Sequence, residues 1–184
     1  LNALADLGYQ TPTTIQEKAF SPIMSGKDVL GIAQTGTGKT VAFLLPCLRQ
    51  WTFSKEKFPQ IIVLVPTREL VVQVVEVVKQ LTKYMNVVVG GVYGGANLNT
   101  QAIMVQNGVD VVVGTPGRLL DLILHGALRT RNVKKLVIDE VDEMLDLGFR
   151  HQLMSIFGQL PAKRQNLLFS ATLSDDVDEL LDTF

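Results

Sequence analysis

Apolar and polar residues follow two alternating patterns along the chain. Short, mostly apolar runs rich in β-branched residues recur, and between them apolar residues stand three or four positions apart. The first pattern is typical of strands buried on both faces, and the second of amphipathic helices. We expect strands at residues 29–32, 61–65, 87–92, 109–113, 136–138 and 167–169. We expect helices at residues 1–7, around 19–24, from 39 onward, at 69–84, 98–106, 118–125 and 149–160, and after 174.

This alternation of strands and helices predicts an α/β fold with one parallel sheet that helices cover on both faces. Parallel neighbours need crossover connections, and a helix between successive strands supplies them. Ligands of such sheets bind at the carboxyl ends of the strands. Residues that directly follow each predicted strand are therefore the first candidates for function.

Residues 69–84 carry conflicting signals. Their six valines favour a strand. Polar residues at 69, 73, 76, 80 and 83, however, are spaced three or four apart and not two. This spacing predicts a helix with a wide buried face.

Composition limits the class of protein. The 184 residues suffice for one ordinary domain with a core. The net charge of −1 excludes a generally basic surface, so any contact with a polynucleotide must be local. The single cysteine, Cys47, excludes internal disulfides and is expected to be a buried thiol. Because the chain begins with Leu1 and ends at Phe184 inside a predicted helix, we expect it to be a piece of a longer protein.

No apolar run is long enough to span a bilayer, and no charged-then-apolar leader stands at the N-terminus. We therefore expect no membrane partner. We also expect the protein to be monomeric. The expected location is intracellular, with the cytoplasm as first choice and the nucleus or an organelle left open.

The stretch Ala33–Thr40 joins the strand at 29–32 to a helix that begins near Lys39. Its glycines let backbone N–H groups converge on an anion, Lys39 adds a charge for the outer phosphates, and the Thr40 hydroxyl can hold Mg²⁺. The general phosphate-loop pattern has glycine where Ala33 stands. The alternative is a glycine-rich turn with a purely structural role. The residues expected to bind nucleotide here are Gln34, Thr35, Gly36, Thr37, Gly38, Lys39 and Thr40.

The acidic pair Asp139-Glu140 follows the strand at 136–138. Asp139 can position Mg²⁺ through water, and Glu140 can orient or deprotonate an attacking water. The alternative is an acidic helix N-terminus stabilised by the helix dipole, since Glu143 and Asp146 follow. Together with the phosphate loop, the pair favours hydrolysis of a nucleoside triphosphate with Lys39, Asp139 and Glu140 as catalytic residues.

Four more motifs follow in order: Pro66–Leu70, Gly94-Gly95, Thr115–Arg118 and Ser170–Thr172. With these, nearly the whole chain resembles the first RecA-like domain of a DEAD-box ATP-dependent RNA helicase, a family in which alanine commonly opens the phosphate loop. The resemblance implies a RecA-like P-loop domain over residues 1–184 that binds ATP and Mg²⁺. It also implies RNA as partner and a second RecA-like domain, which supplies arginines, later in the same protein.

The stretch from Gly8 to Gln16 resembles the element that gives this family its preference for adenine. A carboxamide both donates and accepts, so Gln16 suits the N6 amine and N7 of adenine, and Tyr9 offers a ring for stacking. The alternative is that Gln16 only caps or decorates a helix.

The resemblance also implies a set of RNA-contacting residues. Their glycines, hydroxyls, helix N-termini and arginines suit a sugar-phosphate backbone and not a base edge, so binding should be independent of sequence. For Arg68 and Arg118 the alternative is an intramolecular salt bridge. The residues are Thr67, Arg68, Gly94, Gly95, Thr115, Pro116, Gly117 and Arg118.

In the family, hydroxyls of the Ser-Ala-Thr motif bond to the last acid of the Asp-Glu-x-Asp motif and couple hydrolysis to strand separation. The corresponding residues here are Ser170, Thr172 and Asp142. Val141 stands where alanine is usual, and its two extra methyl groups are expected to crowd that contact by about 1 kcal/mol without abolishing activity.

These expectations lead to the ATP-binding half of an RNA helicase that closes on RNA when ATP binds. An ATP-gated RNA clamp or assembly factor is the alternative, because the same motifs serve both. A DNA helicase or a phosphate-loop kinase is disfavoured by Gln16 and by Thr115–Arg118. We expect the chain alone to bind adenine nucleotides weakly and to hydrolyse ATP barely.

Overall fold

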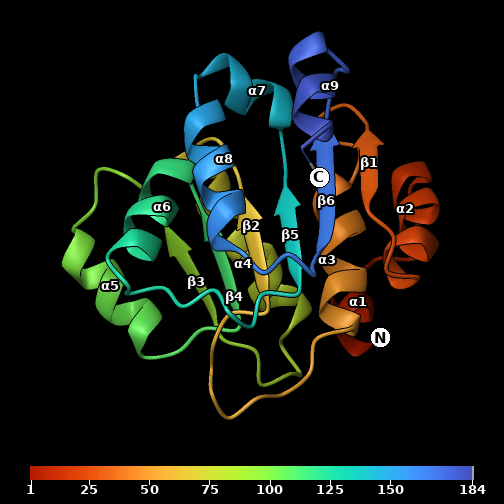
Figure 1. The fold of residues 1–184 in the computed structure, drawn as a ribbon. Coiled ribbons are helices and arrows are strands. Elements are labelled where there is room, and N and C mark those ends of the chain that lie inside the picture. The colour runs from red at the N-terminus through yellow and green to blue at the C-terminus, as the bar shows by residue number, and fades with distance from the viewer. Residues whose placement is uncertain (184) are drawn as a thin grey trace.

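The computed structural model describes residues 1–183, and there helices and strands alternate along the chain (Figure 1). The predicted end of the last helix at Phe184 lies outside the described residues. The elements are α1 (Asn2–Asp6), α2 (Thr14–Met24), β1 (Val29–Ile32), α3 (Lys39–Arg49), β2 (Ile61–Leu64), α4 (Arg68–Leu81), β3 (Val89–Val92), α5 (Leu98–Gln106), β4 (Val111–Gly114), α6 (Pro116–Leu124), β5 (Lys135–Ile138), α7 (Val141–Asp146), α8 (Arg150–Gln159), β6 (Gln165–Ser170) and α9 (Asp175–Leu181).

The six strands form one sheet in the order β1-β6-β5-β2-β4-β3, and every paired neighbour is parallel. The predicted α/β fold is therefore confirmed. Because all strands run the same way, their carboxyl ends share one edge, at the top of Figure 1. All the motifs that follow a predicted strand lie at that edge.

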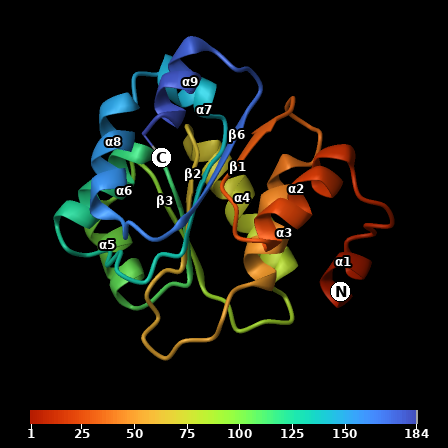
Figure 2. The same cartoon turned by 45° about the vertical axis from the view of Figure 1, so that its right-hand side comes forward.

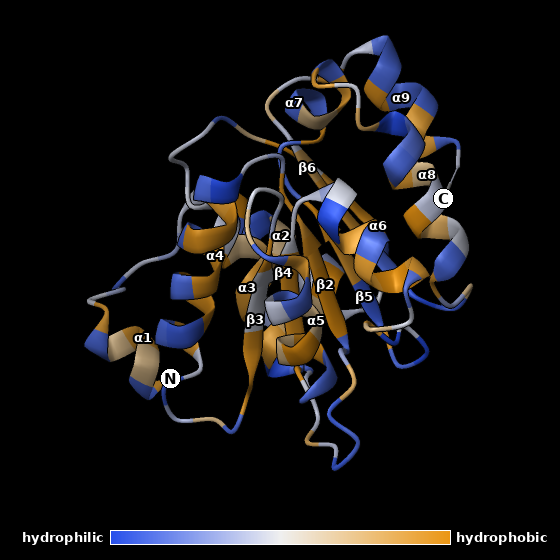
Figure 3. Cartoon of the chain, turned by 90° about the vertical axis from the view of Figure 1, so that its left-hand side faces the viewer, coloured by the Kyte–Doolittle hydropathy of each residue, from blue (hydrophilic) through white to orange (hydrophobic). Residues whose placement is uncertain are grey.

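Two hydrophobic cores lie on the two faces of the sheet. In β2, Ile61 and Val63 point to one core and Ile62 and Leu64 to the other. Helices α2, α3 and α4 cover the first face, and α5 to α9 cover the second (Figure 2). Figure 3 shows the resulting apolar strands between more polar helices. Burying one such side chain stabilises the fold by about 1.5–3 kcal/mol, which explains why the strands are almost purely apolar.

The valine-rich stretch forms helix α4, as its polar spacing predicted. Val71, Val74 and Val78 are buried, whereas Val72 is 54 % exposed. Thr67 begins the helix by accepting a hydrogen bond from the Leu70 N–H at 3.3 Å. The helical period therefore outweighed the strand propensity of valine, because α4 has one face to bury against the sheet.

Strand ends differ from the predictions by up to two residues, and strand β6 shows why. It includes Gln165 and Asn166, whose polar side chains did not suggest a strand. Gln165 donates to the carbonyls of Ile23 and Lys27 at 3.0 and 2.6 Å. Asn166 donates its backbone N–H to Asp28 at 2.7 Å. These partners lie about 140 positions away, so no local pattern predicts them.

Helix α7 was not among the expected helices, although the alternative interpretation of the acidic stretch, a helix N-terminus, anticipated one here, and its first turn holds Asp142 and Glu143. Its six residues are too few for a helical period, and Gly148, in the left-handed conformation, follows its end. Cys47 is buried as expected, and burial raises the pKa of its thiol to about 12. Among residues 1–183, no helix is both long and apolar enough to cross a membrane.

Candidate functional site

The strand order divides the carboxyl edge of the sheet into two halves. The phosphate loop, Asp139-Glu140 and Ser170–Thr172 follow β1, β5 and β6, which are neighbours. The other three motifs follow β2, β3 and β4, which are also neighbours. Motifs that the sequence spreads from Ala33 to Thr172 thus form two adjoining groups.

The phosphate loop relies on two glycines in the left-handed region. Gly36 has φ +82° and Gly38 has φ +86°, and Gly38 is the N-cap of α3. The Thr37 hydroxyl donates to the Gln34 carbonyl at 2.7 Å and closes the turn. This backbone aims the first N–H groups of α3 out of the sheet, where the helix dipole favours an anion.

Gln16 packs directly against this loop. Its Nε2 donates to the Gly38 carbonyl at 3.2 Å, and its Oε1 accepts from the Thr13 N–H at 3.0 Å. The proposed helix-capping role is therefore real, but it uses only one donor and one acceptor of the carboxamide. One N–H and one lone pair stay available for a ligand.

Exchanging Gly38 for alanine is expected to cost more stability than exchanging Gly36. In both variants alanine is destabilised by the left-handed backbone conformation. Only a Cβ at Gly38 also meets other atoms, with Gln16 Nε2 2.6 Å away. Displacing Gln16 loses its two hydrogen bonds, about 1–2 kcal/mol. Urea denaturation of Gly38→Ala and Gly36→Ala measures the difference. In a Gln16→Ala background the difference should shrink to what the Thr13 side chain contributes, because its Oγ1 and Cγ2 lie 3.1 and 3.3 Å from the added Cβ. If the difference keeps its full size there, the explanation is wrong.

Lys39 and Asp139 form a buried pair beneath the loop. Their side chains are 6 % and 7 % exposed, and Lys39 Nζ lies 3.8 Å from Asp139 Oδ1. Within the described residues Nζ has no hydrogen-bond partner. Burial raises the pKa of Asp139, and the Lys39 charge partly opposes that rise. A buried ammonium with unused donors is suited to an anion that arrives from outside.

Glu140 is the N-cap of α7 and has left-handed backbone, with φ +55° and ψ +50°. A non-glycine residue in this region is strained by roughly 1–3 kcal/mol. Burial, a hydrogen bond with Glu143 and the nearby Asp139 raise the pKa of Glu140 to about 7. Its carboxyl group can therefore both accept and release a proton near neutral pH.

Asp142 connects α7 to the segment after β6. Its Oδ2 accepts from the Thr172 N–H at 3.1 Å and from the Thr172 hydroxyl at 3.0 Å. Burial would raise the pKa of Asp142, but these bonds and one from the Glu143 N–H outweigh it and lower the pKa. The predicted contact is thus present for Thr172. Ser170 adds to the lowering, although its buried hydroxyl has no partner of hydrogen-bond geometry among the described residues.

Val141 is fully buried in the core beneath this contact, so its extra methyl groups pack against apolar neighbours. Whether they alter the Asp142 contact stays a prediction.

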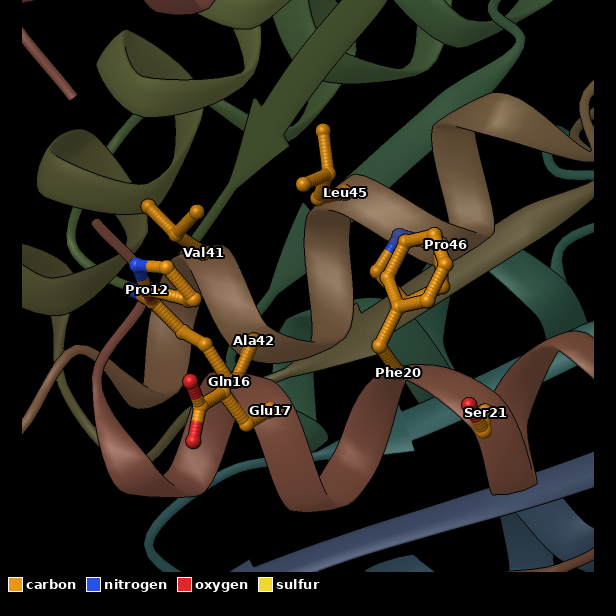
Figure 4. A pocket seen from close by; sticks show the side chains of 9 residues that line it. All are labelled: Pro12, Gln16, Glu17, Phe20, Ser21, Val41, Ala42, Leu45 and Pro46. Carbon is orange, nitrogen blue, oxygen red and sulfur yellow. The ribbon is translucent and has the colours of Figure 1, made fainter. Parts of the chain in front are cut away.

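Two hollows lie beside Gln16, between α2 and α3. The larger, 360 Å³, has Gln16 and Phe20 on one wall and Val41 and Leu45 on the other (Figure 4). The smaller, 170 Å³, adds Tyr9, whose ring is 46 % exposed. Gln16 and Tyr9, the two predicted adenine contacts, therefore share one apolar surface next to the phosphate loop.

The two arginines of the second group, Arg68 and Arg118, form no ion pair in the part of the chain described here. The alternative of an intramolecular salt bridge is therefore wrong for both, and other contacts hold them. Arg118 instead donates to Gln101 Oε1 at 2.7 Å and to the Ala96 carbonyl at 3.0 Å. The Arg68 guanidinium lies 4.9 Å from the centre of the Tyr93 ring. Tyr93 and Gln101 were not singled out in the sequence, because only the fold brings them to these arginines.

The glycines of the second group border open space. A Cβ at Gly94, Gly95 or Gly117 would meet no atom within 4 Å. Pro116 differs, because it is buried as the first residue of α6 and begins that helix instead of facing solvent. The predicted RNA-contacting set is thus brought together, with Pro116 in a structural position.

The first group fits Mg²⁺ only in company with phosphates. Residues 1–183 hold no cluster of three or more His, Cys, Asp or Glu that could bind a metal alone. Thr40 and Asp139 offer oxygen donors beside the unused Lys39 ammonium, a set that suits Mg²⁺ when phosphate oxygens and water complete its shell.

Comparison with known proteins agrees with this geometry. Residues 13–180 match the family described as DEAD/DEAH box helicase. The chain is 45 % identical over its whole length to ATP-dependent RNA helicase DeaD of Escherichia coli K12. It is 45 % identical over 98 % of its length to DEAD-box ATP-dependent RNA helicase 24 of rice, Oryza sativa subsp. japonica. It is 40 % identical over its whole length to eukaryotic initiation factor 4A of Dictyostelium discoideum.

The chain spans 29 %, 24 % and 45 % of the lengths of these three relatives, in the same order. The family match covers far more than half of the chain, from α2 into α9, and includes both groups of motif residues. The chain therefore belongs to the DEAD/DEAH box helicase family.

Proposed function

We propose that this chain is the ATP-binding, N-terminal RecA-like domain of an ATP-dependent RNA helicase, in which ATP hydrolysis drives local unwinding of RNA or remodelling of ribonucleoprotein. The observation that carries the proposal is the Lys39 ammonium, which is buried beside Asp139 with no hydrogen-bond partner among the described residues. A group in that state is costly unless a ligand uses it. The triphosphate of ATP, cradled by the loop, is that ligand.

Each nucleotide contact follows from a side chain already described. The N–H groups at the start of α3 and Lys39 Nζ hold the phosphates. The free donor and acceptor of Gln16 read the N6 amine and N7 of adenine, and Tyr9 stacks on the base. Guanine presents an oxygen where adenine presents the amine, so GTP is disfavoured.

For hydrolysis, Thr40 and, through water, Asp139 would hold Mg²⁺, which would supply charge stabilisation for phosphoryl transfer. Glu140 orients the attacking water and accepts its proton, a role that its half-buried position and raised pKa support. Lys39 stabilises charge that develops on the outer phosphates. Arginines from a second RecA-like domain complete the site, so this chain alone hydrolyses ATP very slowly.

RNA binds along the second group, over β2, β4 and β3. Thr67, Thr115, the open glycine backbones and the N-termini of α4 and α6 suit phosphates and ribose hydroxyls. Arg68 and Arg118 are held by Tyr93 and Gln101, so each can present its remaining N–H groups without reorganising. Binding is therefore independent of sequence.

Coupling of hydrolysis to strand separation runs through the Asp142–Thr172 contact, which lies within the first group. Strand β6 lies between β1 and β5, so its end borders both the phosphate loop and Asp139. The Ala33 N–H donates to the Ser170 carbonyl at 3.0 Å, which links this segment to the loop. A shift of the loop on nucleotide binding is thus felt at Ser170–Thr172.

The test uses the full-length protein from which this chain comes. ATP hydrolysis is measured with RNA, with DNA of the same sequence and with neither, and unwinding of a short RNA duplex is measured with and without ATP. We expect RNA but not DNA to stimulate ATP hydrolysis, and we expect the RNA duplex to unwind only with ATP. Tight ATP-dependent RNA binding without unwinding would instead indicate an RNA clamp. Strong RNA-stimulated turnover by residues 1–184 alone would contradict the need for a second domain.

A further inference from the structure

The opposite edge of the sheet carries a concentration of positive charge that the proposed function does not use. Three loops lie there, residues 51–60 before β2, 125–134 before β5 and 161–164 before β6, at the bottom of Figure 1. They hold seven of the 17 lysines and arginines and only one acidic residue, Glu56. We call these three loops the basic edge.

Asp28 and Asp110 precede β1 and β4 at this same edge, but much of the remaining negative charge lies elsewhere. Asp142, Glu143 and Asp146 lie on α7, and five more acids lie between Asp175 and Asp182 at α9. Although the net charge is only −1, one edge of the sheet is rich in positive charge and the opposite edge is rich in negative charge. Strands of four to six residues separate these edges by about 13–20 Å, so the charges at one edge are largely screened from those at the other.

The loops of the basic edge contact each other. Lys134 Nζ donates to the Thr52 hydroxyl at 3.4 Å, and the Lys134 N–H donates to the Gln60 carbonyl at 2.9 Å. The Gln165 N–H donates to the Lys134 carbonyl at 2.9 Å. Their cations are thus held on one continuous surface and not on separate mobile loops.

Aromatic rings alternate with these cations. The guanidinium groups of Arg129 and Arg131 lie 5.3 and 4.6 Å from the centre of the Phe58 ring. Lys57 Nζ lies 5.6 Å from the centre of the Phe53 ring, which is 60 % exposed. Contact with the Phe58 ring restrains both guanidinium groups in advance, so less entropy is lost when a ligand binds them.

Two hollows are lined by residues of the basic edge. One, 490 Å³, is lined by Ser54, Arg131, Lys134 and Lys163 among others. The second, 350 Å³, is lined by Phe58, Gln106 and Arg129 among others. Each hollow therefore offers hydrogen-bond donors and at least one cation.

Several of the cations have no strong internal partner. Lys57 pairs with the buried Asp110 at 3.8 Å, and Arg131 pairs with Glu56 at 3.6 Å. No ion pair within the described residues involves Lys55, Arg129, Lys134 or Lys163, all of which are exposed. These four charges are available to an external anion.

We propose that the basic edge is a second RNA-binding surface, which holds a single strand by its phosphates and stacks bases on Phe53 and on the Arg129 and Arg131 planes. Exposed cations interleaved with aromatic rings suit a polynucleotide, whose charges and bases repeat along the chain. An acidic protein segment would use the cations but not the planes. Binding here needs no ATP, because the surface lies on the edge opposite the phosphate loop. The choice of RNA over other polyanions rests on the proposed function.

The test neutralises two exposed lysines of the basic edge and compares a matched control. The variant is Lys134→Gln with Lys163→Gln, and the control is Lys18→Gln with Lys79→Gln, which removes the same charge from exposed positions on α2 and α4. Fluorescence anisotropy with a labelled 15-nucleotide single-stranded RNA, without nucleotide, measures affinity at several salt concentrations. We expect about tenfold weaker binding and a salt slope smaller by about 1.4 for the variant, and no more than a twofold change for the control.

Further arms separate the competing outcomes. Lys134→Arg with Lys163→Arg should retain affinity; if it binds as weakly as the glutamine variant, charge is not the cause and the proposal falls. Equal losses in variant and control would also overturn it. A loss confined to a labelled polyglutamate peptide, with RNA binding unchanged, would assign the surface to an acidic protein. Fluorescent ADP binding should be unchanged in every variant. If the parent chain did not bind fluorescent ADP at all, that result would count against the proposed function and not against RNA binding at the basic edge.

Discussion

Replacing Glu140 by glutamine is expected to slow ATP hydrolysis by the full-length protein about 100-fold or more while ATP still binds. The carboxylate directly follows Asp139, the proposed Mg²⁺ ligand, and is half-buried, so it can accept a proton from water, a step that contributes about 10²–10⁴ to the rate. A glutamine has nearly the same shape but cannot accept that proton. Phosphate release with saturating RNA gives kcat and KM, and the loss should lie in kcat.

Glu143→Gln is the matched control, because this carboxyl lies one turn along α7 and hydrogen-bonds to Glu140. Its removal should change kcat less than tenfold, since no reacting atom depends on it. If both variants lose activity equally, the proton-accepting role belongs to neither residue alone.

Glu140→Gln should also stabilise the nucleotide-free chain. A gain in stability would show that the loss of ATP hydrolysis comes from the missing carboxylate and not from unfolding. The folded chain raises the pKa of Glu140 from 4.5 to about 7, chiefly by burial, so the folded state binds this proton more tightly than the unfolded state. The contribution of Glu140 to stability therefore falls as pH rises from about 4.5 to 7. Urea denaturation in EDTA should show Glu140→Gln gaining on the parent between pH 5 and pH 8. A constant difference would contradict the raised pKa.

Replacing Lys39 by methionine is expected to weaken ADP and ATP binding by the chain about 10- to 100-fold. Methionine keeps the length and packing of the buried stem but removes the ammonium that has no hydrogen-bond partner within residues 1–183. A hydrogen bond to a charged group contributes about 1.5–3 kcal/mol. Titration of a fluorescent ADP into the folded chain measures the loss. Arg49→Met, at the exposed end of the same helix, removes an equal charge and should leave the affinity unchanged.

Lys39→Met should also destabilise the chain in a manner that depends on pH. Without the ammonium, the Asp139 carboxylate is buried with no cation, which costs about 3–5 kcal/mol. Burial already raises the pKa of Asp139, and losing Lys39 raises it further, so protonation at low pH relieves the cost. The loss should therefore be smaller at pH 5 than at pH 7.5. It should be largely restored at pH 7.5 by adding Asp139→Asn, and failure of that rescue would mean that the pair is not coupled.

The sequence determined the class of fold and the chemistry of the site. Short apolar runs indicate strands that are buried on both faces, and the helical period between them indicates helices that bury one face. Their alternation is sufficient to predict a parallel α/β sheet. The phosphate loop and Asp139-Glu140 could be found because their residue types and spacing are tied to one chemistry. Even the valine-rich α4 followed from the polar positions Glu69, Gln73 and Glu76.

Only the tertiary structure decided the order of strands and the partners of buried polar groups. Nothing local places β6 between β1 and β5, and yet the strand order sets Thr172 against Asp142 and separates the first group of motif residues from the second. Likewise Arg118 meets Gln101, and Phe58 meets Arg129 and Arg131, across 17 to 73 positions. Periodicity reports how a residue is buried but not against what, since long-range pairing depends on the free energy of the whole packed core.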